Sequence, residues 1–244
     1  MAGAPGNPMR EIKEIDLLEA GRYLGYASPP DAAMLERMAE GARRVTEAAV
    51  PRYIYAGWPA TAREASSGAA GAGCELRGAV FLPGTSIARH MNGCAEGILL
   101  AATLGAGVDA LLRRAALTDL LDSVIMDACA TALAEQVMNA AEAEIRLERE
   151  SAVPVYFTGR FSPGYGDLPL SIQPDILRLL DAPRRIGLSA TDTHILIPRK
   201  SVTAVIGRAA AVLPAEGSLP AAPCAEAGRC GSCALRGACP SRVP

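Results

Sequence analysis

A segment of eight residues that begins at Arg160, RFSPGYGD, is the part of this chain best suited to binding a small charged molecule. Arg160 carries a planar, permanently charged guanidinium that can donate two parallel hydrogen bonds to a carboxylate. Pro163 fixes one backbone angle, whereas Gly164 and Gly166 allow unusual backbone angles and a close approach to a ligand. Tyr165 adds a ring and a hydroxyl. These residue types indicate a pre-shaped anion site with an aromatic wall, with a rigid turn carrying a surface arginine as the alternative.

Polar residues also recur every four positions along a long helix predicted after residue 118. Each step of four residues turns about 40° beyond a full helical turn, so the side chains form one slowly winding stripe. The stripe comprises Ser123, Asp127, Thr131, Glu135 and Asn139. A solvated helix face explains such a pattern. The functional alternative is that Glu135 or Asp127 binds a cationic group of a ligand, because a carboxylate stabilises a nearby positive charge.

Four cysteines lie close together near the end of the sequence, in a C-x5-C-x2-C-x5-C pattern with glycines between them: Cys224, Cys230, Cys233 and Cys239. Four thiolates at this spacing can bind zinc or an iron–sulfur cluster, and the pattern does not distinguish the two. A segment this short has no core of its own, so the metal would have to order it. A tail of unligated thiols is the alternative. The other three cysteines are expected to be ordinary buried side chains: Cys74, Cys94 and Cys129.

The overall composition excludes several classes of protein. The chain has 244 residues, of which 50% are hydrophobic, so one sizeable core is expected. A formal net charge of -2 offers no basic surface for a nucleic-acid backbone. No apolar run reaches the roughly eighteen residues of a membrane helix, and the first residues lack the apolar core of a signal peptide. Seven cysteines without a secretion signal therefore predict a reducing, cytoplasmic location.

The secondary structure that must position these residues is mixed. Helices are predicted over residues 12–26 with Asp16 as N-cap, from Asp31 to Pro51, and from residue 118 or 119 to about residue 148. Shorter helices are expected after Pro83, from about residue 105 to 116 and over 172–180. Strands are expected over residues 53–55, 78–82, 98–103, 153–158, 186–188, 194–197 and 202–206. Helices and strands do not alternate regularly, so we expect an α+β fold with a twisted, mainly antiparallel sheet flanked by helices, one of them long and central.

Composition also suggests where the domain begins and ends. Residues 1–10 mix glycine, proline and charge, which is typical of a flexible N-terminus. Residues 11–212 form the predicted single domain. Residues 213–223 are rich in proline, alanine and glycine and are expected to be a linker. Residues 224–244 are then the cysteine-rich tail, the predicted metal-binding segment.

The hexamer that begins at Arg160, RFSPGY, resembles the R-x-x-x-G-Y signature of the activation domain of cobalamin-dependent methionine synthase. Other blocks, in the same order, resemble short, free-standing relatives of that domain. They are RYLGY at 22–26, TLG at 103–105, the helix over 119–135, GDLPL at 166–170 and PRKSV at 198–202. The resemblance covers about residues 10–207, and several separate blocks are far more specific than the hexamer by itself.

The resemblance implies a site for S-adenosylmethionine. In that family the arginine, the residue two positions after it and the tyrosine contact this ligand, which here are Arg160, Ser162 and Tyr165. Arg160 would hold the ligand carboxylate, Ser162 and Gly164 would form the loop surface, and Tyr165 would pack against the ligand. The functional interpretation of the helix stripe adds Glu135 or Asp127, which would face the sulfonium or amino group of this ligand.

The resemblance also implies a role and partners. The family's activation domain supports the reductive methylation of inactive cob(II)alamin to methylcobalamin, so the chain would be the activation component of a methyltransferase and not a complete methionine synthase. The cobalamin would be carried by a partner, the methionine synthase core. The electron would come from a flavodoxin or a ferredoxin-type protein. A role in methionine biosynthesis follows from the same resemblance.

The histidines are a point of departure from the family. The full-length enzyme has an aromatic pair near the ligand, where this chain has His194-Ile195, so His194 is expected on a strand near the ligand. Asp192 and His194 begin the D-x-H-x-x-G pattern of a cobalt-binding histidine, but Ile197 occupies the glycine position, which argues against a cobalt ligand. His90 is expected at the surface or an interface. Two other functions remain open: a docking module that recognises a corrinoid protein without catalysis, and an iron–sulfur reductive activator that acts through the cysteine tail.

Overall fold

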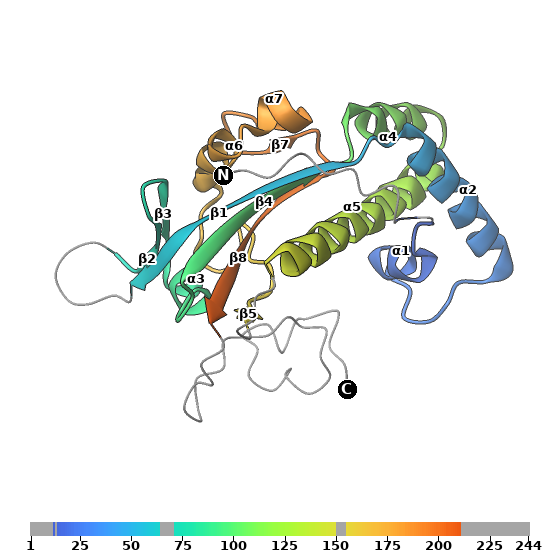
Figure 1. Ribbon diagram of the computed structural model, residues 1–244. Coiled ribbons are helices and arrows are strands. Elements are labelled where there is room, and N and C mark those ends of the chain that lie inside the picture. Colours follow the sequence, from blue (N-terminus) through green and yellow to red (C-terminus); the bar gives the residue numbers. More distant parts are fainter. Residues whose placement is uncertain (1–11, 13, 64–70, 150–154, 211–244) are drawn as a thin grey trace.

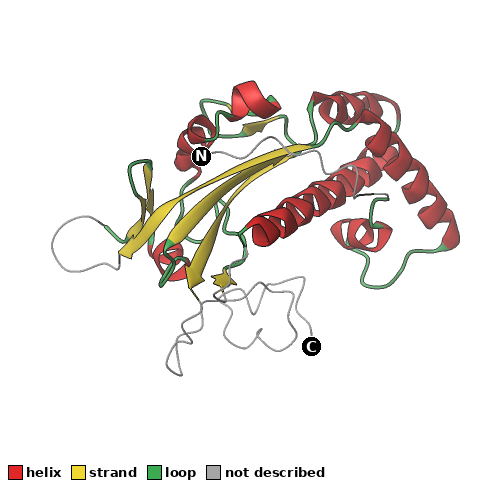
Figure 2. Cartoon of the chain, in the orientation of Figure 1, coloured by secondary structure: helices red, strands yellow, loops and turns green. Residues whose placement is uncertain are grey.

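The computed structural model describes residues 12, 14–63, 71–149 and 155–210. It shows an α+β fold in which a curved antiparallel sheet separates a long helix and its neighbours from a second layer of short helices (Figures 1 and 2). The six strands have the order β3-β2-β1-β4-β8-β5. They are β1 (Arg52–Arg63), β2 (Gly73–Leu76), β3 (Val80–Pro83), β4 (Glu96–Thr103), β5 (Val155–Phe157) and β8 (Ser201–Ala210). The predicted fold class is confirmed.

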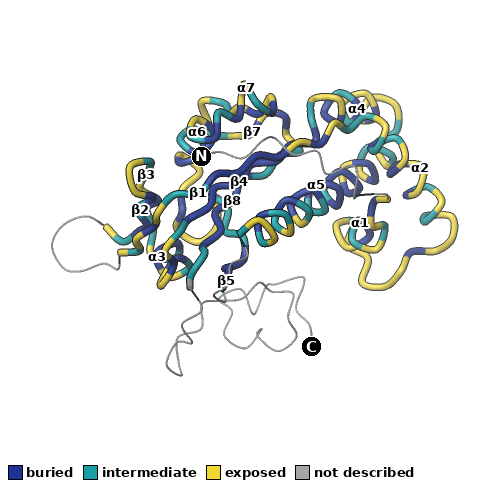
Figure 3. Tube along the Cα trace, viewed as in Figure 1, coloured by how far each residue is buried: buried dark blue, intermediate teal, exposed yellow. Residues whose placement is uncertain are grey.

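Strand β4 lies between β1 and β8 and is buried on both faces. Seven of its eight residues are buried, which explains why it has an almost continuous hydrophobic sequence and no polar alternation. Ile98 and Leu100 belong to the core between the sheet and the long helix, whereas Leu99 belongs to the core on the other face. Figure 3 shows this buried strip along the sheet and the adjoining helix. The sheet is therefore the common wall of two hydrophobic cores.

Four helices cover one face of the sheet: α1 (Leu17–Tyr23), α2 (Ala32–Ala48), α4 (Ala106–Thr118) and α5 (Leu120–Glu148). Three of them begin directly after an aspartate that caps the helix, as predicted for Asp16. The side chain of Asp16 accepts hydrogen bonds from the amides of residues 18 and 19, that of Asp31 from residue 34 and that of Asp119 from residue 122. The many small alanines of α5 let it pack closely against its neighbours.

The opposite face carries α3 (Thr85–His90), a 3-10 turn η2 (Leu170–Ile172), α6 (Gln173–Leu179), α7 (Ala182–Ile186) and the two-stranded ribbon of β6 (Ser189–Ala190) and β7 (Leu196–Ile197). Their apolar residues form the second core with the sheet. Figure 1 shows α6, α7 and β7 on the side of the sheet away from α5. The loop that begins at Arg160 passes between these two layers, at the β8 side of the sheet.

Three predicted strands are wrong in detail. Gly78 has a φ of 73° and lies in the turn between β2 and β3, so the expected strand over 78–82 is part of a hairpin. Ile186 ends helix α7 and begins no strand. His194 has a φ of 65° and lies in the turn between β6 and β7. Short apolar runs do not distinguish helix from strand, which explains these errors.

Several predictions fall outside the described residues. The expected N-terminal segment, the linker over 213–223 and the tail cysteines (Cys224, Cys230, Cys233 and Cys239) all lie there. The metal-binding prediction for the tail therefore stays a prediction. Within the described ranges, no cluster of three or more histidine, cysteine, aspartate or glutamate side chains is arranged to hold a metal ion. Nor does any described helix combine the length and apolar character needed to cross a membrane.

Candidate functional site

The Arg160 guanidinium lies against α5 and contacts the polar stripe. Its Nη2 atom donates hydrogen bonds to Glu135 Oε2 at 3.1 Å and to Asn139 Oδ1 at 2.9 Å. Its Nε atom lies 3.4 Å from Glu142 Oε2. The fold thus brings together Arg160 and Glu135, two of the predicted site residues, from positions 25 residues apart.

One nitrogen of this guanidinium has no acceptor within the described part of the chain. Nη1 of Arg160 is buried and, among the described residues, no hydrogen-bond partner reaches it. Only 22% of the Arg160 side chain is exposed, so water does not readily replace the missing acceptor. A buried donor without a partner costs about 1–3 kcal/mol, and more when it is charged. The arrangement is suited to a ligand that supplies the acceptor, and a carboxylate matches the guanidinium best.

Carboxylates lie beside this guanidinium, and a phenol lies near one of them. Glu142 is shared between Arg160 and Arg146, because its Oε2 atom lies near Arg160 Nε while its Oε1 atom accepts a hydrogen bond from Arg146 at 2.6 Å. Glu135 remains 40% exposed next to Arg160. Burial, followed by the charges of Glu19 and Glu135, raises the pKa of Tyr23 to about 12, so its hydroxyl is neutral at physiological pH. A donor for an anion therefore lies beside a carboxylate that can bind a cation, which suits an amino-acid zwitterion.

The loop after Arg160 is held by its own backbone. Phe161 pairs with Val205 of β8 through two hydrogen bonds, of 2.9 and 2.8 Å. Successive residues of an extended chain point to opposite sides, so Phe161 packs on the second core while Arg160 faces α5. Gly164 then adopts a φ of 93°, and its amide donates to the carbonyl of Leu168 at 2.8 Å. The expected rigid, glycine-dependent turn is present.

Tyr165 and Ser162 lie at the outside of this turn. The amide of Tyr165 donates to the Ser162 carbonyl at 3.1 Å. The Tyr165 side chain is 62% exposed, and its ring meets the Phe161 ring edge-on at 6.3 Å between centroids. The structure therefore pairs Arg160 with Glu135, and Tyr165 with Phe161. The two halves of the R-x-x-x-G-Y signature have different neighbours, on either side of the pairing with β8.

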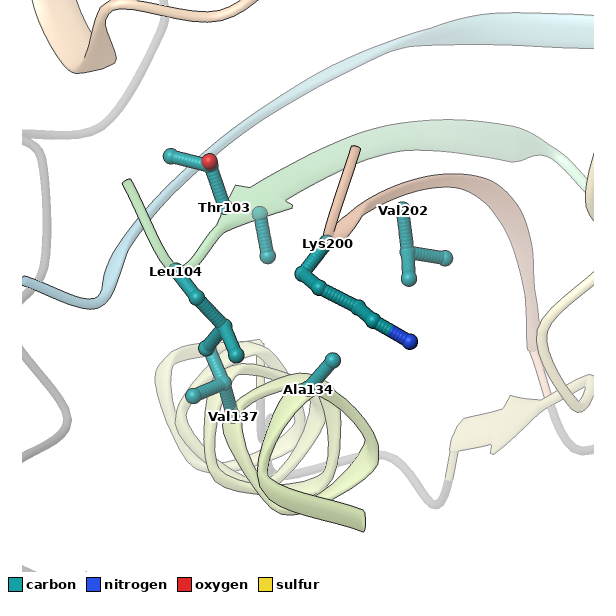
Figure 4. A pocket seen from close by; sticks show the side chains of 7 residues that line it. Thr103, Leu104, Ala134, Val137, Lys200 and Val202 are labelled. Atoms are coloured by element: carbon teal, nitrogen blue, oxygen red, sulfur yellow. The ribbon is translucent and has the colours of Figure 1, made fainter. Parts of the chain in front are cut away.

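A lysine occupies the other half of the α5 stripe. Lys200 Nζ lies 3.0 Å from Asp127 Oδ1 and donates to Thr131 Oγ1 at 2.8 Å. Figure 4 shows this lysine beside a small pocket between α5 and the sheet, lined by Ala102, Thr103, Leu104, Ala134, Val137, Lys200 and Val202. Four of the five stripe residues thus contact a cation from the sheet side. The stripe is still a partly solvated face, because Asp127 and Asn139 remain exposed while they contact these cations.

The structure does not bring His194 to this site. It lies in the β6–β7 turn, and that ribbon packs on the face of the sheet opposite α5 (Figure 1). Its Nδ1 atom is buried and has no hydrogen-bond partner among the described residues. His90, expected at the surface or an interface, is half-buried and packs against Phe161 with 5.0 Å between ring centroids.

Sequence reasoning missed three side chains that contact or lie near the α5 stripe. Glu142 stands seven positions after Glu135, so helical spacing alone could have added it to the stripe. Tyr23 lies within one of the blocks that resemble the family, without any signal that it approaches Glu135. Lys200 lies in another such block, and its contact with the stripe depends on how β8 passes over α5.

Comparison with known proteins identifies a solved structure of similar fold. No protein-family model matches the sequence, and no curated protein matches it. A solved structure, described as the crystal structure of the MetH reactivation domain bound to AdoHcy, superimposes with a TM-score of 0.59. The match covers 85% of this chain and 78% of that one, at 16% sequence identity. The chain therefore has a fold like that of the MetH reactivation domain.

Proposed function

We propose that this chain is an S-adenosylmethionine-binding reactivation subunit for a cobalamin-dependent methionine synthase or a related corrinoid methyltransferase. The observation that carries the proposal is the buried, unpartnered Nη1 of Arg160, at the first position of the R-x-x-x-G-Y motif. The fold supports it, because the similar MetH domain was crystallised with AdoHcy. AdoHcy is the product that remains when S-adenosylmethionine has given up its methyl group, and it has the same amino-acid end.

In this proposal each group of the site binds one part of the ligand. Arg160 Nη1 donates to the ligand carboxylate, and the exposed carboxylate of Glu135 binds the positively charged ammonium or sulfonium. The ligand then follows the loop, with Ser162 and Gly164 as its floor. The Tyr165 ring, largely exposed and supported by Phe161, packs on the apolar part of the ligand.

The contribution of the chain is binding and orientation. Bound S-adenosylmethionine would supply an electrophilic methyl group on a positively charged sulfur. The ion pairs to α5 hold Arg160 in place before the ligand arrives, so little ordering is left for the binding step. The α5 helix presents Glu135 from the same rigid surface. Both anchors are therefore pre-organised relative to each other.

The remaining components would come from other proteins in the cytoplasm. The proposed partners are a corrinoid-carrying methionine synthase core and a flavodoxin or ferredoxin-type electron donor. Together with this chain they would regenerate methylcobalamin from cob(II)alamin. The chain is then the activation component of a methyltransferase.

A reconstitution tests the proposal. The purified full chain is mixed with an oxidised corrinoid protein, a reductant and S-adenosylmethionine, and methylcobalamin is followed by its absorption spectrum. We expect recovery with the wild-type chain and with Arg178→Ala, a change to an exposed ion pair on α6. With S-adenosylmethionine near the wild-type dissociation constant, recovery should be strongly reduced with Arg160→Ala. Absence of recovery with the wild-type chain, together with no S-adenosylmethionine binding by calorimetry, would contradict the proposed function.

A further inference from the structure

Helix α3 contacts the ligand loop at both ends of the helix. At its start, the Asp167 carboxylate accepts hydrogen bonds from the Thr85 amide at 2.6 Å, the Thr85 hydroxyl at 2.7 Å and the Ser86 amide at 2.9 Å. At its end, His90 Nε2 lies 2.9 Å from the carbonyl oxygen of Gly159. Residues 159 and 167 flank the whole R-x-x-x-G-Y motif. One short helix therefore holds the loop at two points.

We propose that His90 and Asp167 are positioning residues that clamp the loop onto α3 and so fix where Arg160 and Tyr165 present their side chains. The inference rests on the proposed function, because it concerns the same ligand site. In this proposal α3 controls the geometry of the ligand site, although α3 lies on the opposite face of the sheet from α5.

The Asp167 end of the clamp is built for close contact. Helix α3 has six residues, too few to be stable in isolation, and its N-cap Gly84 has no side chain to cap it. Asp167 supplies the missing acceptor from 82 positions away. A Cβ atom on Gly84 would lie 2.5 Å from Asp167 Oδ1, and one on Gly166 would lie 2.5 Å from Ser86 Oγ. Glycine at both positions thus lets helix and loop approach this closely, and both have a positive φ that favours glycine.

The His90 end of the clamp acts through a hydrogen bond and through contacts between aromatic rings. Gly159 immediately precedes Arg160, so a fixed Gly159 carbonyl restricts the direction in which the Arg160 side chain projects from the backbone. The His90 ring packs on Phe161 at 5.0 Å, and Phe161 supports Tyr165 at 6.3 Å. The contacts from His90 therefore reach both side chains that the proposed ligand site uses.

Asp167→Ala and His90→Phe test the clamp in the full chain. His90→Phe keeps an aromatic ring on Phe161 and removes the hydrogen bond to Gly159. We expect each change to weaken S-adenosylmethionine binding about tenfold or more by calorimetry, because small displacements of anchoring groups are costly. Asp167→Asn keeps one of the two capping oxygens and His90→Gln keeps a side-chain donor, so each should weaken binding less than Asp167→Ala and His90→Phe do.

Asp31→Ala is the matched control, since Asp31 caps α2 through the Met34 amide at 2.8 Å and lies outside the loop. It should lower the melting temperature and leave the dissociation constant unchanged. Binding weakened equally by Asp31→Ala and Asp167→Ala would mean a general effect of stability and would overturn the clamp.

Hydrogen exchange separates failure of the clamp from failure of the proposed function. The amides of Phe161, Gly164 and Leu168 are hydrogen-bonded within or beside the loop, so their exchange reports its order without any ligand. Asp167→Ala should accelerate their exchange, whereas Asp31→Ala should not. If the wild-type chain binds no S-adenosylmethionine, the proposed function fails and the clamp is judged by exchange alone. Unchanged exchange in both Asp167→Ala and His90→Phe would refute the clamp.

Discussion

Replacing Arg160 tests whether its guanidinium binds the ligand carboxylate or only forms ion pairs with α5. In the free protein its guanidinium contacts Glu135, Asn139 and Glu142, while Nη1 has no partner among the described residues. Arg160→Ala removes the donor for the ligand carboxylate. Arg160→Lys keeps the positive charge, but a single ammonium cannot reach both the α5 carboxylates and the Nη1 position.

The expected loss of affinity follows from the single free donor. A hydrogen bond between charged groups contributes about 1.5–3 kcal/mol. Because each 1.4 kcal/mol changes a dissociation constant about tenfold, Arg160→Ala should weaken S-adenosylmethionine binding by about 10- to 150-fold. The loss of affinity for Arg160→Lys should lie toward the lower end of that range, because lysine retains the long-range attraction between its positive charge and the ligand carboxylate.

Calorimetric titration of the full chain with S-adenosylmethionine and with S-adenosylhomocysteine measures the effect. Both ligands carry the same carboxylate, so Arg160→Ala should weaken both to a similar extent. Arg178→Ala removes an arginine of which 65% is exposed and should leave both affinities within error, because exposed ion pairs contribute little. Wild-type affinity for either ligand in Arg160→Ala would show that the guanidinium does not anchor the carboxylate, and would refute the reasoning.

Three further predictions concern protonation, thiol reactivity and metal. Burial lowers the pKa of His90 below its usual value near 6.5, so the unfolded chain binds this proton first and the free energy of unfolding should fall as the pH drops below about 6.5. In urea unfolding between pH 5 and 8, the free energy of unfolding should depend less steeply on pH for His90→Gln than for the wild-type chain. An identical pH dependence would contradict this prediction. Burial raises the pKa of the thiols of Cys74, Cys94 and Cys129 to about 11, so only about one thiol in a thousand is ionised at pH 8. Mass spectrometry after iodoacetamide treatment of the native chain should therefore find these three cysteines unmodified. Anaerobically purified chain should contain zinc or iron in proportion to protein, and this metal should be lost when Cys230 and Cys233 are both changed to serine. Metal-free wild-type protein would exclude the tail site. Colourless protein with stoichiometric zinc would exclude the iron–sulfur activator.

Local signals in the sequence predicted much of the fold. The capping aspartates Asp16, Asp31 and Asp119 each act on amides two or three residues away, so their roles are visible in a short window. The long helix and the central strand were predicted for the same reason, by periodicity and by a continuous apolar run. Gly78 and Ile186 show the limit, because short apolar runs around them fit strand, turn and helix equally well.

The candidate site was predictable only in part, because its contacts are long-range. Helical spacing placed Glu135 on a stripe, and the motif identified Arg160, but nothing local indicated that the two would meet. The cap that Asp167 gives to α3 spans 82 positions and leaves no sequence signal. His194 was assigned to a ligand-proximal strand by resemblance, whereas the ribbon that contains it packs on the other face of the sheet.

The most direct test of the ligand site is a crystal structure of the full chain grown with S-adenosylhomocysteine. A carboxylate oxygen of the ligand should lie within about 3.2 Å of Arg160 Nη1, with the ligand's ammonium beside Glu135. A ligand bound away from Arg160, or density for the ligand nowhere on α5 or the loop, would contradict the account.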